Sequence, residues 1–169
     1  MGSNHIPVLF QQVIEGLKVQ AGGRYVDATV GGGGHAGGIL IESSPDGRLL
    51  GLDRDPAAIE IAHTYLARYG ERVKLVHCPY NRLAEIVQTH HHAAANGILF
   101  DLGLSSLHLA DPMRGFAFMT DGPLDMRFDP TKNSLTAATL VNELSLEELA
   151  SILYRYGEIE QARRIAKAI

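Results

Sequence analysis

Four consecutive glycines follow an apolar stretch that ends in aspartate, and this run limits the possible folds of the chain more than any other feature. Residues 24–27 are predicted to form a buried strand, and residues 31–34 a loop that opens a helix at His35. A backbone without Cβ atoms lets a ligand come close, and a helix N-terminus favours a polar or anionic group. The run therefore predicts a loop that cradles a nucleotide-like ligand.

Length and composition indicate a soluble globular chain with one sizeable core and a small appendage. The chain has 169 residues and is 46% hydrophobic. Its single cysteine, Cys78, cannot form an internal disulfide, and no apolar stretch approaches the roughly 20 residues of a membrane span. Residues 1–5 lack the pattern of a signal peptide. We therefore expect a cytoplasmic protein without membrane contact.

The formal net charge of −4 disfavours one class of function, nonspecific binding to duplex nucleic acid. Such binding depends on neutralising phosphates and usually leaves a basic surface. An enzyme that acts on a folded RNA is not excluded by this charge.

Apolar β-type runs alternate with helical segments over the first hundred residues. Strands are expected at 24–27, 49–53, 73–77 and 97–101, and helices lie between them at 35–43, 56–69 and 82–89. This alternation is typical of an α/β fold with a parallel sheet and right-handed crossovers. The expected strand order is 3-2-1-4, as in a Rossmann-like sheet.

Local signals set the expected helix ends. Pro7 is expected at the first position of an N-terminal helix, Asp55 before Pro56 as one helix cap, and Asn81 as another. Ser145 and Glu148 form a predicted capping box.

The pattern changes after Asp101. Residues 102–133 contain glycine and proline without sustained periodicity, and a loop of that length is typical of a functional segment. Helical signals return without strands, ending in an expected helix at 158–169. The predicted domains are a cofactor-binding part at 1–109, a substrate and cofactor loop at 110–133, and a helical part at 134–169. The fourth strand would have an open apolar edge, which we expect a second copy or further chain to cover.

The glycine loop and the aspartates at the strand ends indicate an adenosine-containing cofactor. Gly31, Gly33 and Ala36 have the spacing of a dinucleotide fingerprint, and Asp53 lies where a carboxylate binds ribose hydroxyls. An S-adenosylmethionine site needs the same parts. Asp27 would repel a pyrophosphate but could pair with a methionine ammonium, and Asp101 lies at the end of the adjacent strand. S-adenosylmethionine is therefore favoured, with an NAD(P)-dependent oxidoreductase as the alternative enzyme.

Three further features have ordinary structural explanations. Residues 90–92 are three adjacent histidines, which cannot all face one ion from a helix, so we expect a solvated helix end and no metal. Cys78 is expected to be a packed thiol, and Ser105 with Ser106 a turn.

Longer motifs occur in one order along the chain: Asp27-Ala-Thr-Val-Gly-Gly-Gly-Gly-His35, Leu52-Asp-Arg-Asp-Pro56, Asp101-Leu-Gly-Leu-Ser-Ser106, Arg114-Gly-Phe-Ala-Phe-Met119, Asp121-Gly-Pro-Leu-Asp-Met-Arg127 and Tyr156-Gly157-Glu158. Together they resemble the RsmH/MraW family, the methyltransferases of cytosine N4 in small-subunit (16S) ribosomal RNA. The resemblance implies a class I S-adenosylmethionine-dependent methyltransferase sheet, followed by the start of a helical insertion domain.

The resemblance also implies roles for individual residues. Gly33, Gly34 and His35 would contact the cofactor, Asp53 its ribose, Tyr80 its adenine and Asp101 its methionine end. His108 stands where the family usually has a glutamine that contacts the cofactor. The full set of expected cofactor-binding residues is Asp27, Gly31, Gly33, Gly34, His35, Asp53, Tyr80, Asp101 and His108.

Transfer to cytosine N4 needs an acceptor that orients the amine and a base unstacked from its RNA. Asp101 is the first candidate for the catalytic acceptor and Asp125 the second. Phe116, Phe118 and Phe128, with Arg114 and Arg127, are candidates for base stacking and phosphate contact, or alternatively for anchoring the loop. Members of the family are roughly twice as long as this chain, so a noncatalytic module that binds cofactor or RNA is the third hypothesis.

Overall fold

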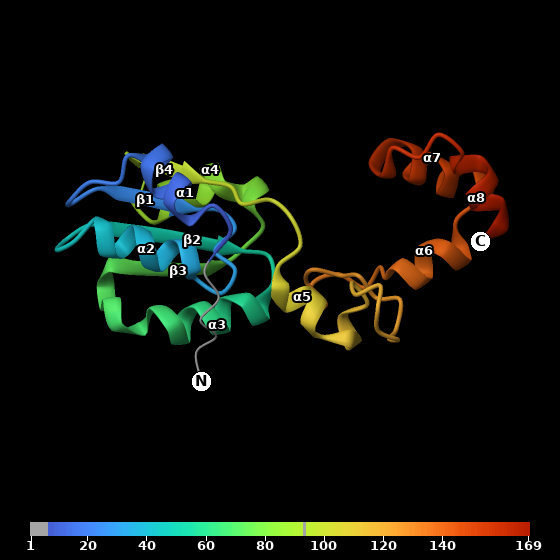
Figure 1. The fold of residues 1–169 in the computed structure, drawn as a ribbon, viewed down its shortest axis with the longest axis horizontal. Helices are drawn as coiled ribbons and strands as arrows, with labels where there is room; N and C mark the ends of the chain where they lie inside the picture. The colour runs from blue at the N-terminus through green and yellow to red at the C-terminus, as the bar shows by residue number, and fades with distance from the viewer. Residues whose placement is uncertain (1–6, 93) are drawn as a thin grey trace. The chain divides into compact units, whose positions relative to one another are not determined.

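The structure is a computed structural model that describes residues 7–92 and 94–169. The described chain divides into two compact units, which meet in the sequence between Gly103 and Leu104. The first unit contains the sheet, and the second contains only helices and loops (Figure 1).

The first unit is built on a parallel sheet of four strands, as predicted. The strands are β1 (Arg24–Asp27), β2 (Arg48–Asp53), β3 (Val73–His77) and β4 (Gly97–Leu99). Their order is β3-β2-β1-β4, which confirms the predicted order. In the register, Asp27 pairs with Gly51 of β2 and Leu99 of β4, and Asp53 pairs with His77 of β3. The carboxyl ends of the strands therefore meet at one edge.

Helices join and cover these strands. They are α1 (Phe10–Leu17), α2 (Gly34–Glu42), α3 (Pro56–Leu66) and α4 (Leu83–Thr89), with 3-10 turns at η1 (Ala67–Arg72) and η2 (Tyr80–Arg82). The expected cap at the start of α3 is confirmed, because the Asp55 side chain accepts a hydrogen bond from the backbone N–H of Ala57 at 2.9 Å.

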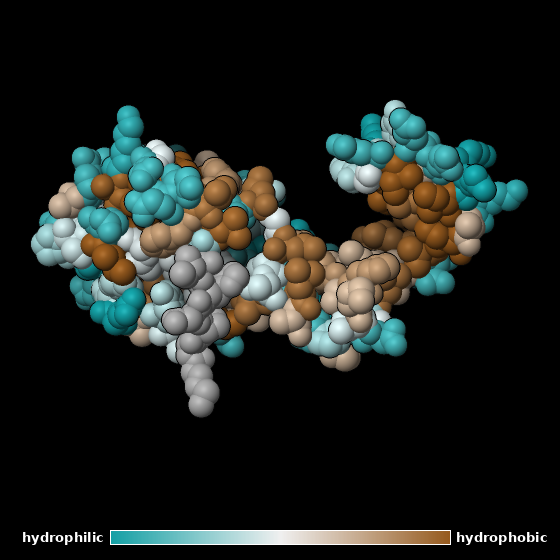
Figure 2. All heavy atoms as spheres, in the orientation of Figure 1, coloured by the Kyte–Doolittle hydropathy of each residue, from teal (hydrophilic) through white to brown (hydrophobic). Residues whose placement is uncertain are grey.

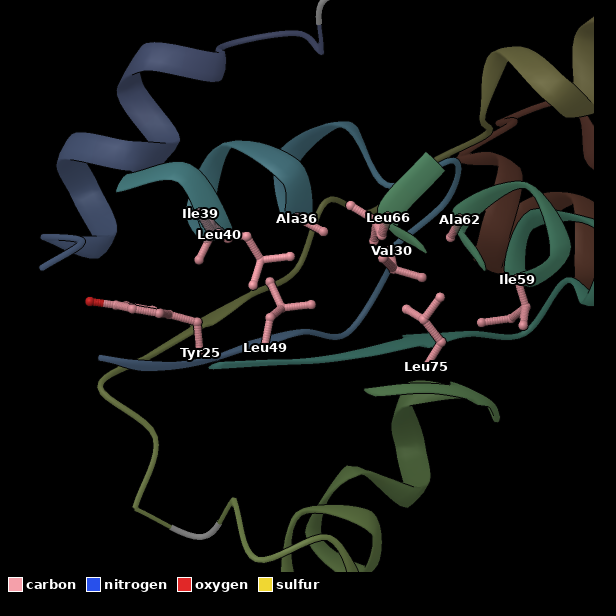
Figure 3. Packing of buried hydrophobic residues seen from close by; sticks show 10 residues of the cluster. All are labelled: Tyr25, Val30, Ala36, Ile39, Leu40, Leu49, Ile59, Ala62, Leu66 and Leu75. Carbon is pink, nitrogen blue, oxygen red and sulfur yellow. The ribbon is translucent and has the colours of Figure 1, made fainter. Parts of the chain in front are cut away.

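Both faces of the sheet are buried, because neighbouring residues of each strand point to opposite sides. Tyr25 and Leu49 point to the face of the sheet that α2 and α3 cover, and they belong to the cluster drawn in Figure 3. Val26 and Leu50 face the other side, where they pack with Ile86 of α4 and with Cys78. Cys78 is buried, which confirms the expected packed thiol. Burial on both faces explains the continuous apolar runs in the strands.

Several predicted element ends were wrong. The N-terminal helix begins at Phe10 and not at Pro7, because Leu9 has a left-handed backbone conformation. Helix α3 ends at Leu66 and continues as a 3-10 turn that contains Gly70. Strand β4 stops at Leu99, two residues short of Asp101. Asn81 lies inside a 3-10 turn and does not cap α4.

The histidine run was only partly predicted. His90 and His91 follow the end of α4, as expected, but His92 is buried with 8% exposure. His91 is left-handed, the N–H of His92 donates to Val87 O, and the N–H of His91 donates to Gln88 O. This is the hydrogen-bonding pattern of a Schellman cap, in which the residue after the turn commonly packs inward.

The second unit contains α5 (Ser106–Ala110), η3 (Pro112–Arg114), α6 (Ala137–Glu143), α7 (Leu146–Gly157) and α8 (Ala162–Ala168). The Ser145–Glu148 capping box at the start of α7 is confirmed. The helix expected at 158–169 begins at Ala162, because Glu158 is left-handed and ends α7. Apolar side chains remain exposed on this unit, among them Leu124, Leu135 and Ile165. Figure 2 shows brown, hydrophobic areas on its surface.

No helix in the described ranges has both the length and the apolar character needed to cross a membrane.

Two isoleucines of α3 provide a test of the core. Ile59 is 8% exposed and belongs to the cluster in Figure 3, whereas Ile61 is 42% exposed. Ile59→Ala is expected to lower the free energy of unfolding by about 2–4 kcal/mol, because it removes apolar contacts and leaves a cavity. Urea unfolding measures the change, with Ile61→Ala as the matched control at less than about 1 kcal/mol. Equal losses in both variants would contradict this packing.

Candidate functional site

Three aspartates lie at the carboxyl edge of the sheet. Asp27 and Asp53 are the last residues of β1 and β2, and Asp101 follows the end of β4. The backbone N–H of Asp101 donates to the Thr29 hydroxyl at 2.7 Å, which ties the segment after β4 to the turn after β1. The three acidic residues thus gather near one edge from three adjacent strands, as ligand sites of open parallel sheets do.

The Asp53 carboxylate organises two turns at this edge. One oxygen accepts the N–H of Gly31 at 2.8 Å, and the other accepts the N–H of Asp55 at 2.8 Å. The predicted ribose-binding residue is therefore also the residue that joins the glycine loop to the start of α3.

Asp27 is 1% exposed at the end of the central strand. The pKa of Asp27 is raised to about 7, mainly because the carboxyl is buried. A hydrogen bond from the Thr29 N–H opposes this rise, and the nearby carboxylates of Asp53 and Asp101 contribute to it. A cation placed beside Asp27 would reverse this effect, because it stabilises the ionised form.

The structural reason for glycine differs among the four positions of the loop. Gly31 and Gly33 have left-handed backbone, with φ of +51° and +91°. A Cβ on Gly34 would lie 2.5 Å from Pro7 Cγ. Gly32 has neither constraint, since a Cβ there would make only an ordinary contact with Ile61 at 3.5 Å. Nothing in the described chain requires glycine at position 32, which is what the close approach of a ligand would explain.

His35 lies directly after the loop, in the first turn of α2. It is 6% exposed and stacks on Phe10, with ring centroids 6.1 Å apart. Its Nε2 lies 3.6 Å from Asp101 Oδ2, and neither ring nitrogen has a hydrogen-bond partner among the described residues. Burial lowers the pKa of His35, which the Asp101 carboxylate partly opposes. Buried polar atoms without partners are uncommon, and here they indicate a missing polar neighbour.

Two half-exposed aromatic rings lie near this edge. Tyr80, in the turn after β3, meets Phe100, which follows β4, edge to face at 5.9 Å. The two residues come from opposite ends of the sheet order. Sequence reasoning missed Phe100, because it stands inside the run 97–101, whose apolar pattern predicts strand throughout.

His108 has an internal role in the second unit. Its Nδ1 accepts the N–H of Ser105 at 3.2 Å, and the Ser105 side chain accepts the N–H of His108, which together form a capping box. His108 is 3% exposed. The centroid of its ring lies 5.0 Å from that of Phe116 and 4.6 Å from that of Phe128. Ser105 is therefore the N-cap of α5, where a turn was expected.

Asp125 and Arg127 pair within the long loop. Both carboxylate oxygens of Asp125 accept from the Arg127 guanidinium, at 3.0 and 3.1 Å from Nε. These bonds hold the pKa of Asp125 below its ordinary value. Arg114 donates to the carbonyls of Arg127 and Phe128. The geometry favours loop support by these groups, and the catalytic role of Asp125 stays a prediction.

Comparison with protein families gives a match that covers nearly the whole chain. Residues 2–169 fit the model described as the MraW methylase family. The chain belongs to this family. The glycine loop, the aspartate edge and the Asp125 loop are thus parts of an MraW methylase sequence.

Individual relatives of the MraW methylase chain agree. A ribosomal RNA small subunit methyltransferase H from Symbiobacterium thermophilum is 49% identical over 169 residues, which is 100% of this chain and 53% of the relative. One of the same name from Syntrophotalea carbinolica is 50% identical over 165 residues, with 98% and 52% covered. The chain spans about half the length of these curated relatives.

Among solved structures, the MraW methylase chain is similar over part of its length to an S-adenosylmethionine-dependent O-methyltransferase from Thermotoga maritima. The identity is 20%, the TM-score is 0.40, and the match covers 46% of this chain and 30% of the other.

The first unit of this MraW methylase contains most of the predicted site residues. Asp27, Asp53, Asp101, His35 and Tyr80 all lie in it, with the glycines of the loop. His108 and Asp125 belong to the second unit. Sequence reasoning missed Gly32, because the fingerprint spacing skips it, although the unbroken run of glycines was a visible signal.

Asp27→Asn is expected to make stability less dependent on pH. Because the pKa of Asp27 rises from 3.8 to about 7 on folding, the folded chain holds a proton that the unfolded chain releases. Wild-type stability should therefore fall as pH rises from about 4 to about 7, by at most about 1.4 kcal/mol per pH unit. The asparagine keeps an oxygen acceptor for the Thr29 N–H without the charge.

Urea unfolding at about pH 5 and pH 8 measures this effect, and the variant should exceed wild type in stability at the higher pH. Asp46→Asn, at an exposed position, is the control with the same chemical change. If Asp27→Asn keeps the full pH dependence of wild type, the buried carboxyl is not its source.

Proposed function

We propose that this chain binds S-adenosylmethionine and methylates the N4 amine of a cytidine in small-subunit (16S) ribosomal RNA, in the cytoplasm. The observation that carries the proposal is the aspartate edge beside the glycine loop, in a chain of the MraW methylase family. Family membership does not favour the oxidoreductase alternative. A module that binds cofactor or RNA without catalysis remains the competing function, since the relatives are about twice as long.

The residues at the edge suit the chemical groups of this cofactor. Asp27 would pair with the methionine ammonium, and its burial makes the pairing favourable because the carboxyl lacks a cation. Asp53, whose carboxylate ends β2 beside the glycine loop, would bind the ribose hydroxyls. Tyr80 and Phe100 offer half-exposed faces to an adenine ring. Gly31, Gly33 and Gly34 shape the loop, and the ring nitrogens of His35 lack a polar neighbour.

Asp101 is the residue we assign to catalysis. When bound, S-adenosylmethionine supplies an electrophilic methyl group. The cytosine amine is a weak nucleophile, because its lone pair is delocalised into the ring. An acceptor that binds one N–H orients the amine and lets its nitrogen pyramidalise. The Asp101 side chain is 61% exposed at the aspartate edge, so it is accessible to a substrate in a way that the buried Asp27 is not.

The second unit would contribute RNA contacts through the loop at 110–133, with 134–169 as the start of a helical domain. Of the three loop phenylalanines, Phe116 and Phe128 pack on His108, whereas Phe118 is 98% exposed. Phe118 is therefore the ring available to stack on an unpaired base. His108 stays a proposed cofactor contact and Asp125 a proposed second catalytic residue. Both side chains also form hydrogen bonds within the second unit. A second copy or further chain at the open edge, where Ile98 is 45% exposed, is also part of the proposal.

Two measurements test the function. Titration calorimetry should give heat with S-adenosylmethionine and none with NADH, because a buried carboxyl at the loop disfavours a pyrophosphate. Labelled methyl groups should then pass from the cofactor to unmodified small ribosomal subunits. Heat with NADH alone would refute the proposal, and cofactor binding without transfer would favour the noncatalytic module.

Gly32→Ala is expected to separate binding from folding. The chain leaves room for a Cβ at this position, so the free energy of unfolding should change by less than about 1 kcal/mol. Affinity for S-adenosylmethionine should fall about tenfold or more, which is about 1.4 kcal/mol. Titration calorimetry and urea unfolding of the same preparation measure both quantities.

Gly33→Ala is the contrasting control, because its φ of +91° and the 3.1 Å approach of a Cβ to Leu66 predict a loss of stability of about 1–3 kcal/mol. Unchanged affinity in Gly32→Ala would place the cofactor away from this part of the loop.

A further inference from the structure

A cavity of about 240 Å³ lies at the amino-terminal edge of the sheet, at the opposite strand ends from the aspartates. It is lined by the start of β2, by two residues just before β3, by Lys74 of β3, and by residues 89–92 at the end of α4. We call it the amino-edge cavity, and its polar lining includes Arg48, Glu71, Arg72, Lys74 and His92. The proposed function assigns nothing to it.

The amino-edge cavity is cationic. Arg48 and Lys74 are exposed, and neither side chain has a hydrogen bond or ion pair within residues 7–92 and 94–169. Arg72 is held by backbone carbonyls, with its Nε donating to Gly47 O at 2.8 Å, so it adds charge in a fixed position. Glu71 is the one carboxylate lining the cavity among the described residues. The balance there is positive in a chain whose net charge is −4.

His92 adds a buried polar atom without a partner. Its Nδ1 lies 3.1 Å from His90 O, and since a carbonyl only accepts, Nδ1 donates. Its Nε2 is buried and has no partner among the described residues. At the end of α4, the carbonyls of Val87 and Gln88 accept hydrogen bonds within the cap, and His91 O accepts one from the Arg24 guanidinium at 3.3 Å.

An oxyanion would satisfy these groups together. The buried Nε2 of His92 adds to this lining a polar atom that has no partner among the described residues. Two unpaired cations on adjacent strands are suited to a phosphate, whose several oxygens accept from separate donors. Because Arg48 and Lys74 are exposed to solvent, a phosphodiester within a large molecule can reach them.

We propose that the amino-edge cavity binds a phosphate group of the RNA backbone. The inference rests on the proposed function for the identity of the RNA, but the phosphate chemistry stands on the cavity alone. It gives the RNA a second binding point, at the sheet edge remote from the cofactor.

The test uses the whole chain and a transcript of small-subunit ribosomal RNA. The double variant Arg48→Gln/Lys74→Gln should reduce the slope of log affinity against log salt by about 0.7 for each single-strand phosphate that the variant no longer neutralises. Glu71→Gln should tighten RNA binding, because it removes the one described carboxylate of the lining. A gain of affinity cannot come from unfolding. Arg163→Gln/Arg164→Gln, with the same charge change on exposed positions of α8, should leave the slope as in wild type.

Inorganic phosphate provides the second arm. Its addition should shift the NMR signals of the His92 ring in wild type and not in the double variant. Shifts with phosphate but an unchanged RNA slope would overturn the RNA backbone as the source. An equal slope change in the α8 control, or no shift at all, would overturn the site.

Heat of S-adenosylmethionine binding, measured alongside, reports on the proposed function separately. The double variant should keep it, because Arg48 and Lys74 lie at the other end of their strands from the aspartate edge. A chain that shows the phosphate shift and the slope change without binding S-adenosylmethionine supports the cavity and overturns only the proposed methyl transfer.

Discussion

The Asp53 carboxylate is the interaction on which the candidate site depends. By accepting from Gly31 and Asp55 it connects the turn after β1 to the turn after β2, across two neighbouring strands. The glycines of the loop have no side chains that could fix its conformation, and three of them adopt positions that a side chain would disfavour. A carboxylate at the end of β2 supplies the acceptors that a loop of bare N–H groups requires. The loop, the start of α3 and the predicted ribose contact therefore share one side chain.

Much of the fold was predictable, because the relevant signals are local or follow from parallel topology. The order β3-β2-β1-β4 and the meeting of Asp27 and Asp53 at one edge followed from the alternation of strands and helices. The capping residues Asp55 and Ser145 act through neighbours two or three residues away, so their spacing alone identified them. Pattern reasoning works where sequence distance and spatial distance agree.

The errors came from contacts and conformations that no local pattern encodes. Leu9 and Glu158 adopt left-handed backbone without being glycine, and each changes a helix end. His92 turns inward because a cap forms before it, so a run that is polar in sequence is partly buried. Asp125 was predicted to be catalytic, His108 to contact the cofactor, and Phe116 and Arg127 to contact RNA. In the structure Asp125 pairs with Arg127, and Phe116 packs against His108. Such groups can be sorted only when the partners within the loop are known.

Asp27 shows how a site can be costly to the fold and selective for its ligand. A carboxyl buried at the end of the central strand, near two other carboxylates, makes the ionised folded chain less stable than it would be without it. A cation bound beside Asp27 would stabilise the ionised carboxylate and offset this loss of stability, whereas a neutral or anionic group would not. A ligand bound at the end of β1 would therefore be selected by the sign of its charge as well as by its shape, and the free energy for this selection is set when the protein folds.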